Sequence, residues 1–392
     1  MKVYLDNAAT TKPHIEVVEK MNYVLNEDYG NPSSKHIKGY DAEKYLKESR
    51  NIISKLMKVD SKEIYFTSGG TEANNLALIG AAMANKRRGM HIISTRIEHP
   101  SVYNPLLFLE ELGYEIEFLE VDNMGHVSIE DLKGKLRQDT ILVSTMFVNN
   151  EVGAVQDIAQ IGQAIKDYDK DIVFHVDAIQ GFGKYKIYPK RCNIDLMSVS
   201  GHKIHGPKGI GFLYIKDKTR IKTVFLGGGQ EKGFRSGTEN VPGIAGLGEA
   251  TRLVYEEFDK NIETMYALKK HLIAGLLKIE NVTINAVDMN QLDEEIIKKT
   301  APHVVSASFE GIKSEVLLHS LEDKGVYVSS GSACSSNHPA ISGTLKAIKV
   351  KDNLLDSTIR FSFASTTTIE DIDYTIQCLQ ELVPILRRYK RY

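Results

Sequence analysis

Seven short β-rich segments alternate with helix-length segments between residues 63 and 215, and this alternation restricts the fold more than any other feature. The predicted strands are Glu63–Thr67, His91–Thr95, Ile116–Val121, Ile141–Val148, Ile172–Val176, Leu196–Ser200 and Ile210–Ile215. Predicted helices between them are Glu72–Lys86, Ser101–Leu112 and Ile158–Tyr168. Apolar strands separated by helices indicate a mainly parallel sheet covered on both faces. We therefore predict an α/β fold.

The pattern changes after Gly246. Residues Leu247–Leu277 have apolar positions at helical spacing, which predicts one or two long helices. Short strands near Val304–Phe309 and Val326–Ser329 follow, and the chain closes with a predicted helix over Ile369–Tyr389. We predict a large α/β domain over residues 15–258. A smaller α+β domain would combine residues 1–14 with residues 259–392.

Composition excludes several classes of protein. The 392 residues carry a formal net charge of −2, which disfavours direct nucleic-acid binding through bulk electrostatics. The chain has no run of about 18 apolar residues, so we predict no membrane span. Its opening residues, MKVYLDNAATT, show no targeting pattern. The three cysteines are too scattered for a disulfide framework. We expect a cytoplasmic protein without a structural metal.

Cys334 lies in an unusual setting, the stretch VSSGSACSS at Val328–Ser336. A buried structural cysteine normally has bulky apolar neighbours, whereas the neighbours here are serine, glycine and alanine. Such residues cannot pack a core, but they can form a mobile loop that carries a reactive sulfur. The alternative is an ordinary loop with an incidental cysteine.

The segment TSGGTEANN at Thr67–Asn75 predicts a phosphate site. A strand ends there, two glycines follow, and a helix begins near Thr71, so backbone N–H groups and a helix N-terminus meet at one turn. The glycine spacing is not that of a dinucleotide or nucleoside triphosphate motif. The alternative is a simple helix cap.

Two further strand ends carry reactive side chains. Asp177 follows one buried strand, and Ser200, His202 and Lys203 follow the next. In open α/β sheets ligands gather at the carboxyl ends of strands. A phosphate site, a strand-end aspartate and a strand-end lysine are what pyridoxal 5'-phosphate (PLP) requires: the lysine forms a Schiff base and the aspartate pairs with the pyridine nitrogen. Alternatively Asp177 caps a helix. A metal site at His202 and His205 lacks a third ligand nearby.

Motifs over nearly the whole chain carry a resemblance. They are YLDNAATT at Tyr4–Thr11, GNPSS at Gly30–Ser34, FTSGGTEANN at Phe66–Asn75, IEHPSV at Ile97–Val102, VNNEVGAVQ at Val148–Gln156, HVDAIQ at His175–Gln180, SGHKIHGPKGIG at Ser200–Gly211, GGGQEKGFRSGTEN at Gly227–Asn240, SSGSACSS at Ser329–Ser336 and IRFS at Ile359–Ser362. The chain resembles the PLP-dependent cysteine desulfurases of the NifS/IscS type (group I), in the class V aminotransferase family. The resemblance implies PLP fold type I.

The resemblance also implies how PLP is held. Lys203 would bind the cofactor covalently and shuttle protons, His99 would stack on the ring and serve in acid–base steps, and Asp177 would pair with the ring nitrogen. The remaining cofactor-binding residues are expected to be Gln180 and Asn149 beside the phenolic oxygen, and Gly70, Thr71, Ser200 and His202 at the phosphate. Thr238 is expected to reach the phosphate of the other subunit, which implies a homodimer.

For the reaction, the resemblance implies conversion of L-cysteine to L-alanine. Arg360 would bind the substrate carboxylate, with Asn149 nearby, and Cys334 would take the sulfur as a persulfide. Two of these residues have alternative roles: Asn149 could be a turn residue, and Arg360 could belong to a surface ion pair. The sulfur would pass to an acceptor protein, either an iron–sulfur scaffold or a tRNA-thiolation enzyme.

The sequence leaves open several related reactions and differs from the family pattern at one place. A selenocysteine lyase or cysteine-sulfinate desulfinase would share nearly every residue, whereas an aminotransferase would not need Cys334. A scaffold that binds PLP without catalysis would be expected to lack Lys203 or Cys334. After IRFS the chain reads Phe363-Ala364-Ser365 where relatives usually have Leu-Gly-Arg. The unbroken spacing between Cys334 and Arg360 favours the branch with a long cysteine loop.

Overall fold

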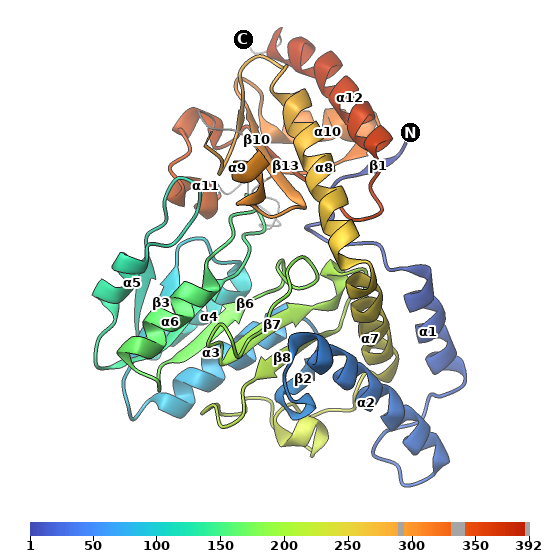
Figure 1. Ribbon diagram of the computed structural model, residues 1–392, viewed down its shortest axis with the longest axis vertical. Coiled ribbons are helices and arrows are strands. Elements are labelled where there is room, and N and C mark those ends of the chain that lie inside the picture. Colours follow the sequence, from blue (N-terminus) through green and yellow to red (C-terminus); the bar gives the residue numbers. More distant parts are fainter. Residues whose placement is uncertain (289–293, 331–341, 389–392) are drawn as a thin grey trace.

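A seven-stranded sheet forms the centre of the computed structural model, which describes residues 1–288, 294–330 and 342–388 (Figure 1). In spatial order its strands are β2 (Ile64–Thr67), β8 (Gly211–Ile215), β7 (Leu196–Ser200), β6 (Val173–Asp177), β5 (Thr140–Met146), β3 (His91–Thr95) and β4 (Glu115–Leu119). Strands β3 to β7 run parallel to their neighbours within this group, and β8 is antiparallel to both β7 and β2. All seven predicted strands are present, and the α/β prediction is confirmed.

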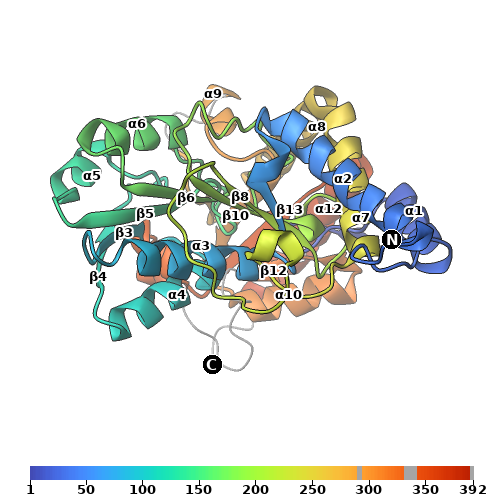
Figure 2. The same cartoon turned by 90° about the horizontal axis from the view of Figure 1, so that it is seen from below.

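Helices cover both faces of this sheet (Figure 2). One face carries α3 (Gly70–Asn85) and α4 (Pro100–Glu111), and the other carries α5 (Ile129–Lys135) and α6 (Ile158–Tyr168). Helix α6 buries Ile158, Ile161 and Ile165, whose spacing of three and four residues gives the helix one apolar side. Helices α1 (Ile15–Asn26), α2 (Ile37–Met57) and α7 (Val241–Glu256) pack together beside the sheet.

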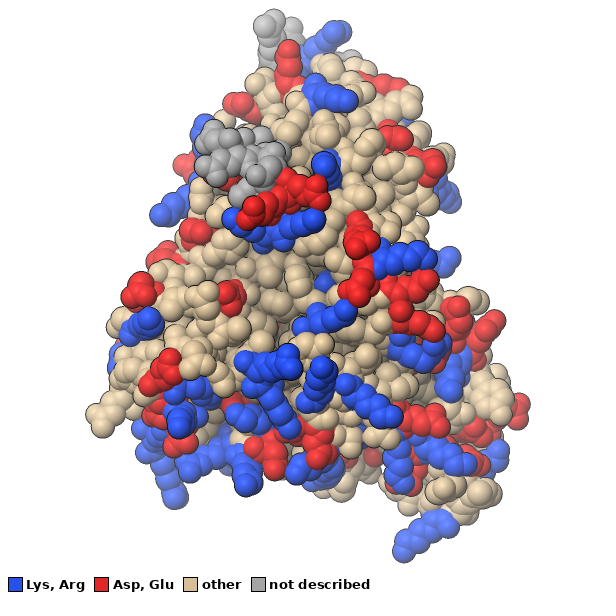
Figure 3. Space-filling view, in the orientation of Figure 1, with Lys and Arg blue, Asp and Glu red and all other residues tan. Residues whose placement is uncertain are grey.

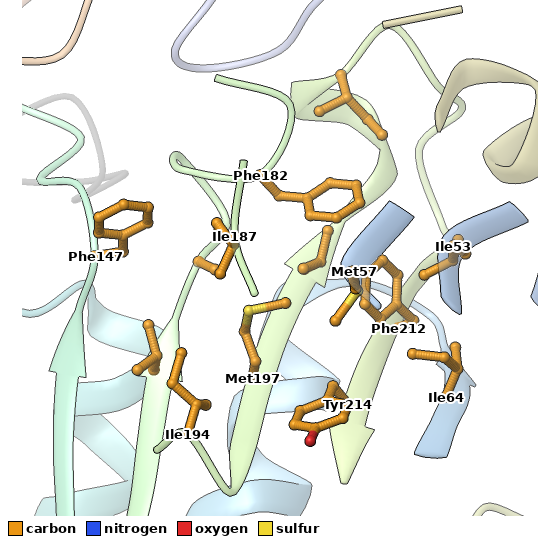
Figure 4. Packing of buried hydrophobic residues seen from close by; sticks show 14 of the residues in the cluster. Ile53, Met57, Ile64, Phe147, Phe182, Ile187, Ile194, Met197, Phe212 and Tyr214 are labelled. Atoms are coloured by element: carbon orange, nitrogen blue, oxygen red, sulfur yellow. The ribbon is translucent and has the colours of Figure 1, made fainter. Parts of the chain in front are cut away.

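The main core lies between the sheet and these last helices (Figure 4). Phe212 of β8 meets Phe182 edge to face, with ring centroids 5.3 Å apart. Ile53 and Met57 of α2 are buried in the same cluster. Burying an apolar side chain of this size contributes roughly 1.5–3 kcal/mol, so the strands that end at residues 177 and 200 are held firmly.

A second sheet lies at the other end of the molecule (Figure 1). Its antiparallel strands are β12 (Ser329–Ser330), β13 (Thr358–Ser362), β10 (Val304–Phe309) and β9 (Val282–Ile284), and its own apolar core includes residues from α8 (Phe258–Leu276), α10 (Ser314–Asp323) and α12 (Ile369–Arg388). The segment Leu247–Leu277, predicted as one or two helices, forms two, because α7 and α8 are separated at Glu257. The shorter helices are η1 (Ser61–Glu63), η2 (Gly201–Lys203), η3 (Gln230–Gly233), α9 (Glu294–Lys298), α11 (Gly343–Ala347) and η4 (Asp352–Leu354).

The first residues of the chain join this second sheet region. Strand β1 (Val3–Tyr4) pairs in parallel with β11 (Val326–Tyr327), and Val3 and Leu5 are buried in the same core as α8 and α12. Asn7 Nδ2 donates to the carbonyl of Ser362 at 3.1 Å. The N-terminal segment is therefore fixed between the two sheets.

The surface bears both signs of charge. Basic and acidic side chains intermix over the face seen in Figure 3. Within the described ranges, the helices are all too short or too polar to cross a membrane.

Candidate active site

A cavity of about 440 Å³ lies between the two sheets, a size typical of small-molecule sites. Its floor is formed at the carboxyl ends of β5, β6 and β7 and at the N-terminus of α3, and residues of β12 and β13 close it from the second sheet. The lining residues are Asp6, Ala8, Ala9, Gly70, Thr71, His99, Ser101, Met146, Val148, Asn150, Asp177, Ile179, Gln180, Ser200, His202, Lys203, Ser329, Ser330 and Arg360.

Asp177 is the last residue of β6 and its carboxylate is buried. Its Oδ1 accepts a hydrogen bond from Ile179 N at 3.0 Å, and its Oδ2 accepts one from Asn74 Nδ2 at 2.9 Å. Burial raises the pKa of Asp177 above its ordinary value, while these hydrogen bonds oppose the rise. Since both donors are uncharged, the carboxylate is suited to a cation bound in the cavity.

Lys203 belongs to η2, the short helix that follows β7. Its Nζ donates to the carbonyls of Ala8 and Ala9, at 2.6 and 2.7 Å, so the ammonium is held against the N-terminal segment at the cavity. Gln180 Nε2 also donates to Ala8 O, at 2.9 Å. Lys203 and Gln180 are thus both joined to the N-terminal segment at one wall of the cavity.

The N-terminus of α3 completes the floor of the cavity. Its N-cap is Gly69, which has no side chain to accept a hydrogen bond from the first turn, so the backbone N–H groups there are available to an anion. A Cβ atom on Gly70 would lie 2.1 Å from Ile179 Cδ1, so a larger residue would require the isoleucine to move. Burial lowers the pKa of His202 to about 4, and His202 is therefore a neutral hydrogen-bonding group at pH 7.

His99 is the N-cap of α4 and lines the cavity. Its Nδ1 lies 2.8 Å from Ser101 Oγ and accepts a hydrogen bond from Ser101 N at 3.1 Å. Asn74 Nδ2 donates to the same Ser101 Oγ at 2.9 Å, as well as to Asp177. A continuous chain of side chains therefore connects Asp177 with His99.

Arg360 reaches the cavity from β13 of the second sheet. Its Nη2 lies 2.7 Å from Asp6 Oδ1, and its Nη1 donates to Asn150 O at 3.0 Å. The side chain is buried, so the surface ion pair considered from the sequence is not what the structure shows. A guanidinium fixed in this way can bind a carboxylate with defined geometry.

Two expected site residues do not line the cavity. Asn149 Oδ1 accepts hydrogen bonds from Glu151 N and Val152 N, both at 2.9 Å, and its Nδ2 donates to Ile97 O at 3.1 Å. The amide is used to hold a turn, and the cavity wall is formed by the residues on either side of it. Thr238 is exposed and also lies outside the cavity lining of its own chain.

Cys334 lies outside the described residues, which do not include 331–341. In the sequence it follows Ser330 by four positions, and Ser329 and Ser330 of β12 both line the cavity.

Sequence reasoning missed several members of this site. Asn74 and Ser101 lie within two of the motifs that carried the resemblance, but their residue types gave no sign of a connection to His99. Asp6 and Asn150 are likewise motif residues whose position at the cavity depends on packing between distant segments.

Comparisons with known proteins find relatives over nearly the whole chain. The family model for aminotransferase class-V matches residues 3–375. A cysteine desulfurase IscS of Dictyoglomus turgidum is 43% identical over 392 residues, covering 100% of this chain and 97% of the relative. A solved structure described as a NifS-like protein has 35% identity and a TM-score of 0.91, covering 98% of this chain and all of the other. Another, described as SspA in complex with cysteine, has 31% identity and a TM-score of 0.81, covering 94% and 100% of the two chains.

Proposed function

Since this chain belongs to the class V aminotransferase family, among the PLP-dependent cysteine desulfurases of the NifS/IscS type, we propose that it converts L-cysteine to L-alanine and takes the sulfur onto Cys334 as a persulfide. The observation that carries the proposal is a single cavity in which Asp177 and Lys203 lie at the floor and Arg360 enters from the second sheet.

The cavity fits PLP. A buried carboxylate with uncharged hydrogen-bond donors suits the protonated ring nitrogen, and the open helix N-terminus at Gly70 and Thr71 suits the phosphate. Ser200 and His202 would add polar contacts there, His99 would cover the ring, and Gln180 would contact its phenolic oxygen. When bound, PLP supplies an electron-withdrawing ring that weakens the bond between Cβ and Sγ of the substrate.

Arg360 would bind the carboxylate of L-cysteine. The guanidinium is held by Asp6 and by the carbonyl of Asn150, so little side-chain freedom remains to be lost on binding. The relative SspA, described in complex with cysteine, supports cysteine as the ligand of this cavity. Lys203 Nζ would move the proton at the substrate Cα.

The sulfur step would use the thiolate of Cys334. A new S–S bond forms between Cys334 and the substrate Sγ while the Cβ–Sγ bond breaks. The electron pair of the broken bond goes to Cβ, which takes a proton, so that alanine and a Cys334 persulfide result. A thiolate is the reactive form of cysteine in such an attack.

A homodimer is the assembly we propose. Thr238 is exposed and is not among the residues that line the cavity of its own chain, as expected for a residue that serves a partner subunit. Val224, Phe225 and Leu226, in the same segment, are 36%, 45% and 84% exposed, which suits an apolar contact.

The sulfur would leave Cys334 for an acceptor protein, an iron–sulfur scaffold or a tRNA-thiolation enzyme. We place the enzyme in the cytoplasm, where reducing conditions keep a thiol nucleophile available.

The test is alanine formation from L-cysteine by the PLP-loaded protein with a thiol reductant. Wild type should form alanine and sulfide, Cys334→Ala should form neither, and Cys192→Ala should match wild type. Full activity of Cys334→Ala would refute the role of that thiol. Absence of alanine from wild type that binds PLP would refute the reaction.

A further inference from the structure

We propose that Asn74 and Ser101 are positioning residues that fix His99 as a hydrogen donor at Nε2, the ring nitrogen left to the cavity. The proposal rests on the proposed function only in giving His99 a place beside PLP. It concerns the hydrogen-bond chain that connects Asp177, Asn74, Ser101 and His99.

The backbone N–H of Ser101 shows which nitrogen of His99 carries the proton. A backbone N–H can only donate, and Ser101 N donates to His99 Nδ1 at 3.1 Å. Nδ1 must therefore be the bare nitrogen of a neutral ring, and the proton is on Nε2. The Ser101 hydroxyl, 2.8 Å from Nδ1, must then donate its hydrogen to that atom.

Asn74 keeps the hydroxyl in this orientation. Its Nδ2 lies 2.9 Å from both Ser101 Oγ and Asp177 Oδ2, so its two amide hydrogens serve the two oxygens. The opposite amide orientation would place Asn74 Oδ1 against a carboxylate oxygen. Because Ser101 Oγ accepts from Asn74, its own hydrogen is directed to His99.

The surroundings of His99 are consistent with a neutral ring. Burial lowers the pKa of His99, the charge of Asp177 at the end of β6 raises it, and the charge of Lys203 in η2 lowers it. The backbone N–H and the hydroxyl of Ser101 both donate to Nδ1, so a proton on that nitrogen is disfavoured. His99 is thereby set to donate a hydrogen bond from Nε2, and acceptance of the substrate proton is left to Lys203.

The experiment is ¹⁵N NMR of the PLP-loaded enzyme labelled at histidine, with the His99 signals assigned by their loss in His99→Gln. In wild type, Nδ1 should have the chemical shift of a bare nitrogen and Nε2 that of a protonated one. In Ser101→Ala and in Asn74→Leu, the two shifts should move part of the way toward each other, because the hydroxyl donor at Nδ1 is lost or released while the backbone N–H of residue 101 remains. The pKa of His99 should rise by roughly 0.5 to 1, as expected for loss of one hydrogen bond.

Ser94→Ala is the matched control, since it removes a buried serine hydroxyl of β3 that has no hydrogen-bond partner among the described residues. It should leave the His99 signals unchanged, and Ser101→Thr should restore the wild-type signals. Unchanged His99 shifts in Ser101→Ala would overturn the proposal, even if Asn74→Leu fails to fold. Alanine formation by wild type is scored separately, so failure of the proposed reaction is distinguishable.

Discussion

The guanidinium of Arg360 lies 2.7 Å from the carboxylate of Asp6, although the two residues are 354 positions apart in the chain. The pair forms because β1 and the residues after it pack against β13 of the second sheet. One consequence is a cavity with walls from both sheets and from the N-terminal segment. Substrate binding should therefore depend on side chains from all three.

Replacing Arg360 by lysine should weaken L-cysteine binding. A lysine keeps the charge but loses the planar fork that pairs with a carboxylate, and charged hydrogen bonds of this kind contribute about 1.5–3 kcal/mol. We expect kcat/KM for alanine formation to fall by roughly 10- to 100-fold, mainly through KM. The exposed Arg252, paired with Glu249, provides the control Arg252→Lys, which should be silent. An unchanged KM in Arg360→Lys would contradict the assignment.

Asp177→Asn should reduce the affinity for PLP. The substitution keeps the shape but removes the buried charge, and losing one partner of a buried charge pair costs about 2–5 kcal/mol. The dissociation constant of PLP, measured by equilibrium dialysis, should rise by roughly 30-fold or more. Asp195→Asn changes another buried aspartate, which pairs with Lys166 and Lys216 away from the cavity. It should lower stability without lowering PLP affinity, and equal losses in both variants would count against the assignment.

Gly70→Ala should also weaken PLP binding, for a steric reason. The new Cβ would lie 2.1 Å from Ile179 Cδ1, so the isoleucine must move at the cavity wall. Overpacking of this kind costs about 1–3 kcal/mol, which corresponds to an affinity loss of about 5- to 150-fold. Ile179→Ala removes both carbon atoms that the new Cβ would approach, Cδ1 and Cγ1, and the double variant should recover most of the affinity. The steric explanation fails if the double variant binds no better than Gly70→Ala.

Glu98 should make the folded protein less stable as the pH rises. Its Oε1 accepts hydrogen bonds from Thr95 Oγ1 and Met146 N, its Oε2 is buried, and burial raises its pKa to about 8, with Asp177 adding to the rise. The folded state therefore keeps a proton that the unfolded state loses near pH 4.3. Between about pH 4.5 and 8 stability falls with pH, by on the order of a few kcal/mol.

Glu98→Gln tests this expectation, because glutamine has the same shape and no proton to lose. Urea unfolding of both proteins at pH 5.5 and pH 8 should show that the wild type loses stability relative to the variant at the higher pH. A difference between the two proteins that does not change with pH would show that Glu98 is ionised in the folded state.

Local structure and membership of the family could be predicted from the sequence. The seven strands and the helices between them follow from apolar periodicity, which is set by neighbours in the chain. Gly70, Asp177 and Lys203 were identified because motif position and residue type together point to one chemistry. Asn149 shows the limit, since one residue type serves a ligand or a turn equally well, and only its hydrogen bonds to Glu151 and Val152 distinguish the two.

By itself, then, the sequence determined the α/β architecture, the PLP-dependent family and the strand ends at which the reactive side chains lie. Only the tertiary structure decided that Asp6 holds Arg360 and that Asn74 and Ser101 join Asp177 to His99. The physical reason is range. Strand and helix propensities act over a few residues, whereas these contacts form between segments that meet only when the sheets and helices pack.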